Sequence, residues 1–166
     1  KIALLKSLHS EYKGSVLVFI RAKHSAGKIC RDLKNAGFFS AEIHSNRSLN
    51  QRREALEGFI FGKYRVLVAT DIASRGIDVK GIELVVNYDL PENPEDYVHR
   101  IGRTGRAGMS GKAISFAMPD QGSKIREIER LTNLYLPIVK LPENLPVSIA
   151  STNSRPRRPY AYGRKR

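Results

Sequence analysis

Three arginines at three-residue spacing are the groups in this chain with the clearest capacity for chemistry. Arg100, Arg103 and Arg106 alternate with glycines in the stretch RIGRTGRAG. Guanidinium groups are always charged and bind phosphate oxygens in pairs, and glycine lets the backbone approach and turn closely. Arginine is also favoured at helix C-termini, which could account for Arg100 alone, since Arg103 and Arg106 follow Gly102. The spacing therefore indicates an anionic ligand.

The chain does not contain the loop that usually cradles nucleotide phosphates. That loop has the form G-x-x-x-x-G-K-[ST]. Each of the three Gly-Lys pairs, at Lys28, Lys63 and Lys112, lacks the upstream glycine and the following Ser or Thr. The arginines are therefore not part of a phosphate-binding loop within this chain.

Composition favours a single domain with a polyanionic partner. The 166 residues carry a net charge of +13, which favours nucleic acid, although solubility alone is a plainer explanation. We expect residues 1–140 to form the domain and residues 141–166 a Pro-punctuated, basic, disordered tail. Tyr160 and Tyr162 could stack on bases there; a solvated tail or an artificial chain end is an equal alternative.

Cysteine and apolar content bear on the compartment. Cys30 is the only cysteine, falls on the apolar face of an expected helix, and permits no internal disulfide, so a reducing cytoplasm fits. No apolar run approaches the length of a membrane span. The first twelve residues resemble the middle of an amphipathic helix rather than a signal peptide. We expect the chain to begin partway into a larger protein.

Hydrophobic periodicity predicts the elements that position the arginines. Strands are expected at residues 15–20, 38–44, 65–70, 82–89 and 112–118. Helices are expected between them, one of which starts with the capping box Ser48-x-x-Gln51 and another at Asn93-Pro94. We expect these apolar residues to face inward: Ala26, Ile29, Cys30, Leu33, Phe39, Ala41, Ile43, Leu49, Leu56, Phe59, Ile125, Ile128 and Leu131.

Alternating strands and helices predict an α/β fold with a mainly parallel sheet between two helical layers. Such sheets place function at the carboxyl ends of their strands. Three polar or glycine-rich loops, at residues 44–48, 70–78 and 100–108, are expected to meet at that edge.

Two stretches carry a family resemblance. VLVATDIASRGIDV (residues 66–79) and YVHRIGRTGRAG (residues 97–108) resemble signature motifs of DEAD-box ATP-dependent RNA helicases, and the similarity runs from about residue 15 to residue 118. The loop spellings are most similar to bacterial members. The family has two RecA-like domains, and the first holds the phosphate-binding loop and an Asp-Glu-Ala-Asp motif, which are absent here. The chain therefore resembles the second, a RecA-like three-layer αβα sandwich.

The resemblance implies a nucleotide role for the arginine stretch. Arg103 and Arg106 would contact the γ-phosphate of ATP, with Arg106 the arginine finger. Asp78 would hold the ribose, and Gly76 would allow close approach. ATP with Mg²⁺ would be held mainly by the N-terminal RecA-like domain, so this chain alone is expected to be inactive.

The resemblance also implies contacts between domains. Arg75 and His99 would link the two domains and help to organise the attacking water. Arg100 is either a further interdomain residue or a structural one.

A single-stranded or short duplex RNA is the other implied partner. Thr70 and Arg52 would bind its phosphates. Arg21 and Lys23 flank a position where the family often has threonine, and could supply a phosphate contact instead. Ser45 stands where the family often has glycine and is a further RNA-binding candidate. Leu49 replaces a usual glutamine, which puts one RNA contact in doubt.

Two functions from different classes fit the sequence. The first is one half of an ATP-driven RNA helicase, which explains Asp78 and the two arginines that follow Gly102. The second is a stand-alone basic RNA-binding module, which explains only the charge.

Overall fold

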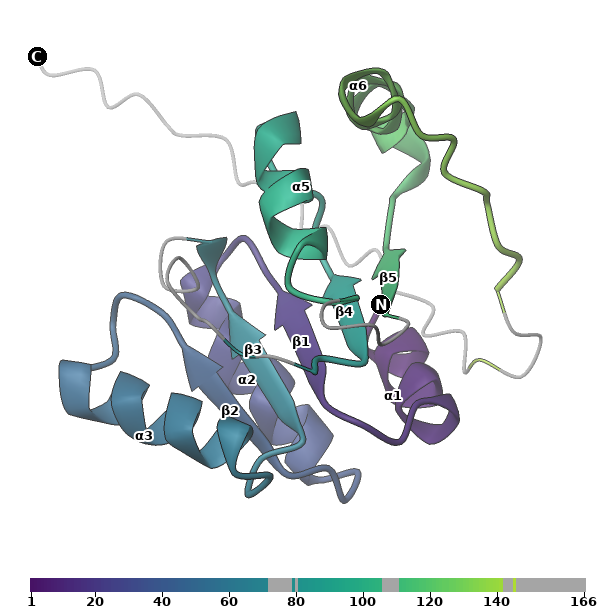
Figure 1. The fold of residues 1–166 in the computed structure, drawn as a ribbon. Coiled ribbons are helices and arrows are strands. Elements are labelled where there is room, and N and C mark those ends of the chain that lie inside the picture. The colour runs from purple at the N-terminus through teal and green to yellow at the C-terminus, as the bar shows by residue number, and fades with distance from the viewer. Residues whose placement is uncertain (72–78, 80, 106–110, 142–144, 146–166) are drawn as a thin grey trace, which may run out of the picture.

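A five-stranded, entirely parallel sheet forms the centre of the molecule (Figure 1). The computed structural model describes residues 1–71, 79, 81–105, 111–141 and 145. The strand order is β2-β3-β1-β4-β5, and all four pairings are parallel. The strands are β1 (Val16–Phe19), β2 (Ser40–Ile43), β3 (Val66–Ala69), β4 (Leu84–Asn87) and β5 (Lys112–Ser115). The predicted α/β class and parallel sheet are confirmed.

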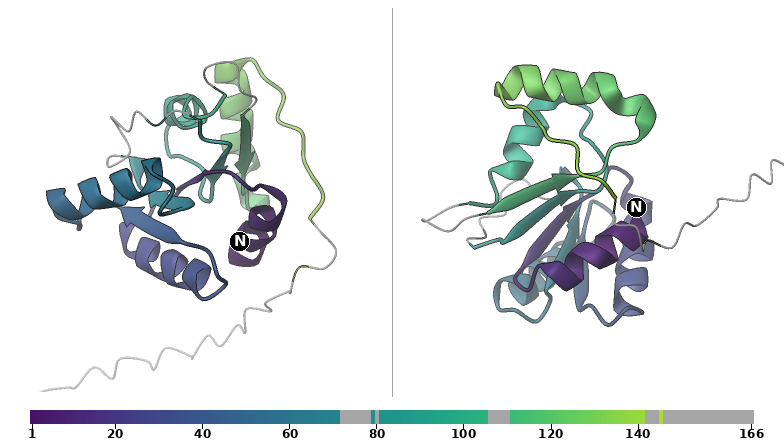
Figure 2. Two further views of the ribbon diagram at one scale, coloured as in Figure 1. Left: turned by 60° about the horizontal axis from the view of Figure 1, so that its bottom comes forward. Right: turned by 90° about the vertical axis from the view of Figure 1, so that its right-hand side faces the viewer.

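Helices cover both faces of this sheet. Helices α1 (Ile2–Glu11) and α2 (Lys23–Lys34) pack on one face, and α3 (Leu49–Ile60) packs on the other. Helix α5 (Pro94–Ile101) and helix α6 (Gly122–Thr132), which follows a short 3₁₀ turn (Pro119–Gln121), form a third apolar cluster around Leu90, Tyr97 and Ile128. Helix α6 lies beyond the carboxyl ends of β4 and β5 (Figures 1 and 2). No described helix is long and apolar enough to cross a membrane.

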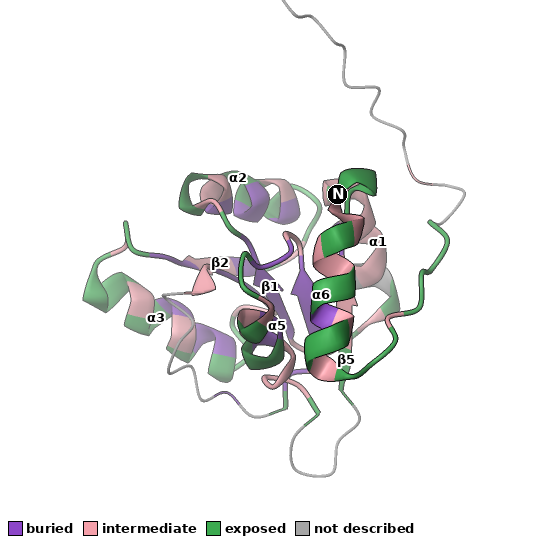
Figure 3. Ribbon diagram, turned by 90° about the horizontal axis from the view of Figure 1, so that it is seen from above, coloured by how far each residue is buried: buried purple, intermediate pink, exposed green. Residues whose placement is uncertain are grey.

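The central strands are buried on both faces, as their continuous apolar sequences predict. In β1, Val16 and Val18 face the α1–α2 layer, while Leu17 and Phe19 face α3. This period of two divides one short run between two cores, and Figure 3 shows the resulting buried centre. The strand ends are therefore fixed firmly, which matters because polar residues follow directly.

Local signals place the helix starts as predicted. The Ser48 hydroxyl accepts the Gln51 N–H at 3.3 Å, and the Gln51 side chain accepts the Ser48 N–H at 3.0 Å, which forms the expected capping box. Asn93 caps α5 through its backbone carbonyl rather than its side chain. The predicted apolar face of α2, from Ala26 to Leu33, is buried.

Three apolar residues that were expected to face inward are exposed instead. Phe39 is 73% exposed because it precedes β2, which begins at Ser40 rather than at residue 38. Ser40 is buried instead, and its hydroxyl donates to the Cys30 carbonyl at 3.1 Å. Leu49 and Leu131 are 68% and 48% exposed. Both lie in end turns of their helices, where an apolar residue in the right period can still project past the layer beneath it.

Candidate functional site

The residues predicted to bind RNA gather at the carboxyl edge of β1, β2 and β3. Thr70 directly follows β3, is half-buried, and donates its N–H to the Ile43 carbonyl at 3.2 Å. Ser45 follows β2 and is exposed. Because Ile43 and Ala69 are paired in the sheet, Thr70 and Ser45 come to the same edge from neighbouring strands.

Arg52 adds a cation from the first turn of α3. Its side chain is half-buried, and its Nε is buried without a hydrogen-bond partner in the structure. Buried donors are normally satisfied. A ligand oxygen, such as that of a phosphate, could accept the hydrogen bond that Arg52 Nε has to donate.

The loop after β2 is held in shape by a carboxylate within the strand. Glu42 pairs with Arg47, and its second oxygen lies 3.5 Å from His44 Nε2. His44 is buried, and its Nδ1 accepts the Asn46 N–H at 3.2 Å. This cluster fixes the loop that carries Ser45.

Arg21 and Lys23 follow β1 and are exposed at the same edge. Between them Ala22 caps α2 without a side-chain hydrogen bond, because alanine has no oxygen to offer. The Arg21 guanidinium forms an ion pair with Glu92 at 2.5 Å. Sequence reasoning missed this carboxylate.

Arg100 is buried rather than at the surface, and it lies at the centre of a hydrogen-bond network that we call the hub. It is 1% exposed and donates two hydrogen bonds to Asp71, at 2.6 and 2.8 Å. It also donates to Asn87 Oδ1 at 3.0 Å and the Asp89 carbonyl at 2.7 Å, and lies over the Phe19 ring. These contacts are those of a structural residue, the simpler of the two roles considered for it; a contact with another domain stays a prediction.

Asn87 continues the hub across the sheet. Its amide donates to the Ser115 hydroxyl at 3.0 Å. Through Asp71, Asn87 and Ser115, the network joins the carboxyl ends of β3, β4 and β5. Asn87 is fully buried, and this polar residue in an apolar run was the one sequence signal that could have revealed the hub.

The described part of the RIGRTGRAG stretch, residues 100–105, does not stay at the carboxyl edge, contrary to expectation. Arg100 lies there, but the Thr104 hydroxyl donates to the Ile82 carbonyl at 2.5 Å, and the two residues form a parallel bridge before β4 begins. The chain must return to the amino edge before a parallel β5 can start. The segment therefore crosses the face of the sheet within a few residues.

Arg103 lies on this crossing segment. It is half-buried, and its N–H donates to the Arg100 carbonyl at 3.2 Å. Gly105 has φ +71°, and a side chain at Gly111 would strike Gly105 and the Thr104 hydroxyl. The two ends of the loop are therefore held together at the start of β5.

The nucleotide candidates are only partly described. Val79 and Ile82 are buried on the α3 face, so the chain after Asp78 approaches the same region as Thr104. His99 is exposed on α5. The remaining candidates lie outside the described residues: Arg75, Gly76, Asp78 and Arg106.

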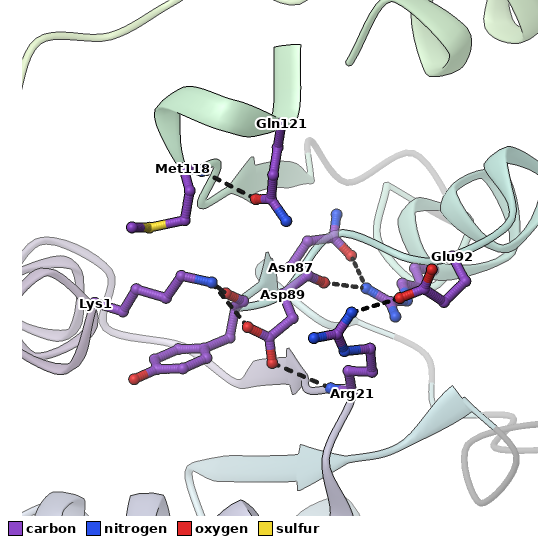
Figure 4. A network of polar contacts seen from close by, with 9 residues as sticks. Lys1, Arg21, Asn87, Asp89, Glu92, Met118 and Gln121 are labelled. Carbon is purple, nitrogen blue, oxygen red and sulfur yellow. Dashed lines mark hydrogen bonds and ion pairs between the residues drawn. The ribbon is translucent and has the colours of Figure 1, made fainter. Parts of the chain in front are cut away.

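Carboxylates link the strand ends to outer elements, as Figure 4 shows. Asp89 accepts from Lys1 Nζ at 2.8 Å and from the Arg21 N–H at 3.2 Å. Glu92 accepts from Lys124 at 2.9 Å and from Arg21. The hydrogen bond from Lys124, followed by that from Arg21, lowers the pKa of Glu92 to about 2.

No cluster of three or more metal-ligating side chains occurs in the part of the chain that the structure describes. The cationic and hydroxyl donors at the carboxyl edge instead suit phosphate oxygens.

Comparisons with known proteins agree with this geometry. Residues 1–108 match the family model described as helicase conserved C-terminal domain. The chain is 39% identical over 163 residues to the ATP-dependent RNA helicase DbpA of Bacillus subtilis, covering 94% of this chain and 34% of that protein. It is 46% identical over 116 residues to the ATP-dependent RNA helicase DBP2 of Pyricularia oryzae, covering 70% of this chain and 21% of the relative. The chain thus spans about a fifth to a third of these relatives.

Solved structures share the fold. A DEAD box protein from Methanococcus jannaschii superposes with a TM-score of 0.75 at 42% identity, covering 81% of this chain and 37% of that one. The Escherichia coli DEAD-box protein SrmB, bound to the regulator of ribonuclease activity A, gives 0.74 at 34% identity, with 78% and 77% covered. Relatives are both bacterial and fungal. The chain belongs to the helicase conserved C-terminal domain family and is the RecA-like C-terminal domain of a DEAD-box helicase.

Proposed function

We propose that this chain is the second RecA-like domain of an ATP-dependent RNA helicase, and that it completes an ATP site held mainly by an N-terminal RecA-like domain. The separation of two cationic sets carries the proposal. The RNA candidates lie at the carboxyl edge of β1–β3, whereas Arg103 lies on a segment that crosses toward the amino end of β4. Two separate locations suit two ligands, and a stand-alone RNA-binding module needs only one.

In this proposal the arginine stretch acts on ATP. Arg103 and Arg106 contact the γ-phosphate, and Arg106 stabilises charge that develops during phosphoryl transfer. Asp78 holds the ribose, and Gly76 admits the nucleotide. Mg²⁺ arrives with ATP on the other domain.

Contacts with the other domain come from separate side chains. Arg75 and His99 are the residues proposed to contact the N-terminal domain and to help orient the attacking water. The exposed position of His99 on α5 supports this role.

The carboxyl edge forms part of a single-stranded RNA path. Thr70 and Arg52 bind phosphates, with Ser45, Arg21 and Lys23 beside them. The unpartnered Nε of Arg52 supports a missing acceptor at this place. Such phosphate contacts position the strand without reading its sequence.

The buried pair of Arg100 and Asp71 connects the two sites. Asp71 is next to Thr70 in the chain, and the Arg100 carbonyl accepts the Arg103 N–H. A shift of the RNA-contacting segment would thereby reach the nucleotide-contacting segment through two charge-assisted hydrogen bonds. RNA binding can in this way favour the arrangement that hydrolyses ATP.

The organisation and compartment follow the same proposal. Residues 1–140 form the domain, and residues 141–166 form a basic tail that adds phosphate contacts. The buried, unpaired Cys30 supports a reducing cytoplasm as the location.

The proposal is tested in the full-length protein with two substitutions. Arg106→Lys keeps the charge but loses the two-pronged donor, so kcat should fall about 10³-fold while ATP and RNA binding persist. Arg52→Ala should instead raise the RNA concentration needed for half-maximal ATPase stimulation, with saturated turnover much less affected. Loss of RNA binding in Arg106→Lys with turnover intact would show that the arginine stretch binds RNA and would overturn the proposal.

A further inference from the structure

Two cations from distant parts of the chain converge on one exposed carboxylate. Arg21 Nη1 lies 2.5 Å from Glu92 Oε1, and Lys124 Nζ lies 2.9 Å from Glu92 Oε2. Arg21 follows β1, Glu92 lies between β4 and α5, and Lys124 is on α6. Each carboxylate oxygen thus has its own cation, in the manner in which two cations bind the two unesterified oxygens of a phosphodiester.

Stability does not explain this arrangement. The Arg21 and Glu92 side chains are 64% and 57% exposed, and Lys124 is 31% exposed. Ion pairs at such exposure contribute little to folding. The depressed pKa of Glu92 means that the carboxylate stays charged at every physiological pH, so the cations always face a competing anion.

The position of the pair indicates the ligand. Arg21 leaves β1 beside the end of β3, because Phe19 and Ala69 are paired. An RNA strand that contacts Thr70 therefore passes within reach of Arg21. Lys124 adds a second cation beside Arg21, from helix α6. Figure 4 shows the Arg21 side chain directed at Glu92.

We propose that Arg21 and Lys124 form an additional RNA phosphate site, and that Glu92 occupies this site as a built-in competitor until RNA displaces it. The inference rests on the RNA-binding function proposed above and extends the path onto α6. Glu92 therefore weakens RNA binding and lowers its salt dependence, since displacing an attached carboxylate releases no ion into solution.

The test compares two isosteric substitutions that each raise the net charge by one. Glu92→Gln removes the competitor. Glu54→Gln is the control, because Glu54 forms an exposed pair with Lys63 at 3.7 Å on the outer side of α3. Binding of a fluorescent oligouridylate to the chain is measured by anisotropy across a range of salt concentrations, and thermal melts check that both variants fold.

Glu92→Gln should bind about twofold to tenfold more tightly than Glu54→Gln, the range that two exposed ion pairs allow. Its slope of log affinity against log salt should steepen by about 0.7 for each further phosphate that the protein neutralises. Adding Arg21→Ala or Lys124→Ala to Glu92→Gln should remove the tighter binding. Inorganic phosphate should compete with RNA better in Glu92→Gln than in the control if the site takes any phosphate, and equally if it needs the RNA strand.

Equal affinity and slope in Glu92→Gln and Glu54→Gln would overturn the inference. Weaker binding by Glu92→Gln would also overturn it, because Glu92 would then orient Arg21 for RNA. Both results leave the main RNA path standing if Arg52→Ala still weakens binding. Failure of Arg52→Ala to change binding would instead count against the proposed function.

Discussion

Removing the charge of Asp71 should destabilise the domain far more than its partly exposed position suggests. Asp71→Asn keeps the shape of the side chain but replaces one acceptor oxygen with an amide that faces the Arg100 guanidinium. Arg100 is 2% exposed along its side chain and loses one of two short hydrogen bonds together with its countercharge. Its other acceptors, Asn87 Oδ1 and the Asp89 carbonyl, are neutral.

The size of the effect follows from burial. Breaking one side of a buried ion pair costs about 3–5 kcal/mol, and a hydrogen bond to a charged group contributes about 1.5–3 kcal/mol. Asp71 is 28% exposed, so water can replace part of the loss, and we expect about 3 kcal/mol. For a domain of this size each kcal/mol lowers the melting temperature by roughly 2–4 °C, which gives roughly 6–12 °C.

Urea unfolding followed by circular dichroism measures this difference, provided that the slope with denaturant is unchanged. Glu54→Gln is the matched control, because it removes the same charge from an exposed pair and should change stability by less than about 0.5 kcal/mol. Arg100→Lys should resemble Asp71→Asn, since the single nitrogen of lysine cannot replace a planar guanidinium that donates to Asp71, Asn87 Oδ1 and the Asp89 carbonyl. A loss below about 1 kcal/mol in Asp71→Asn would refute the view that this pair holds the hub together.

Two further predictions concern a buried thiol and catalysis by the isolated domain. Burial, helped by the nearby Glu42 charge, raises the pKa of Cys30 from its ordinary 9.0 to about 11. The thiol therefore ionises at lower pH in the unfolded chain than in the folded one. The stability contributed by the buried neutral thiol is intact below about pH 9, and about 3 kcal/mol is lost as the pH rises toward 11. The free energy of unfolding, measured with urea, should therefore fall more for the wild type than for Cys30→Ala between pH 9 and pH 11. Parallel curves of unfolding free energy against pH for the two proteins would contradict the argument. The chain alone should not hydrolyse ATP with RNA present, because in the function proposed above an N-terminal RecA-like domain holds the ATP and its Mg²⁺; phosphate release clearly above the buffer blank would reject the division of labour proposed here.

Sequence patterns predicted the elements because the signals that start and bury them are local. The apolar face of α2 and the capping box at Ser48 each depend on residues within a few turns. Phe39 and Leu49 show the limit of this reasoning. Periodicity predicts that every apolar residue on one face of an element is buried. At the end of an element, however, such a residue can lie beyond the layer that would cover it.

The site was predicted less completely because its contacts join residues far apart in sequence. Arg21 and Glu92 are separated by 71 positions, and Arg100 and Asp71 by 29. Types and spacing identified the cations, whereas the carboxylates that hold them became evident only in the fold. The return of Thr104 to the amino edge could have been predicted, because a parallel connection from β4 to β5 requires it. We expected instead that all the polar loops would meet at the carboxyl edge.

The burial of Arg100 argues for a division of roles among the three arginines. A guanidinium that already has acceptors in Asp71, Asn87 and the Asp89 carbonyl has little capacity for a phosphate. Its backbone carbonyl, however, accepts the Arg103 N–H. The position of Arg103 is therefore set by a buried residue that is itself anchored beside Thr70. Three similar triplets therefore need not make three similar contacts: Arg100 is structural, and in the proposed function the arginines after it meet the nucleotide.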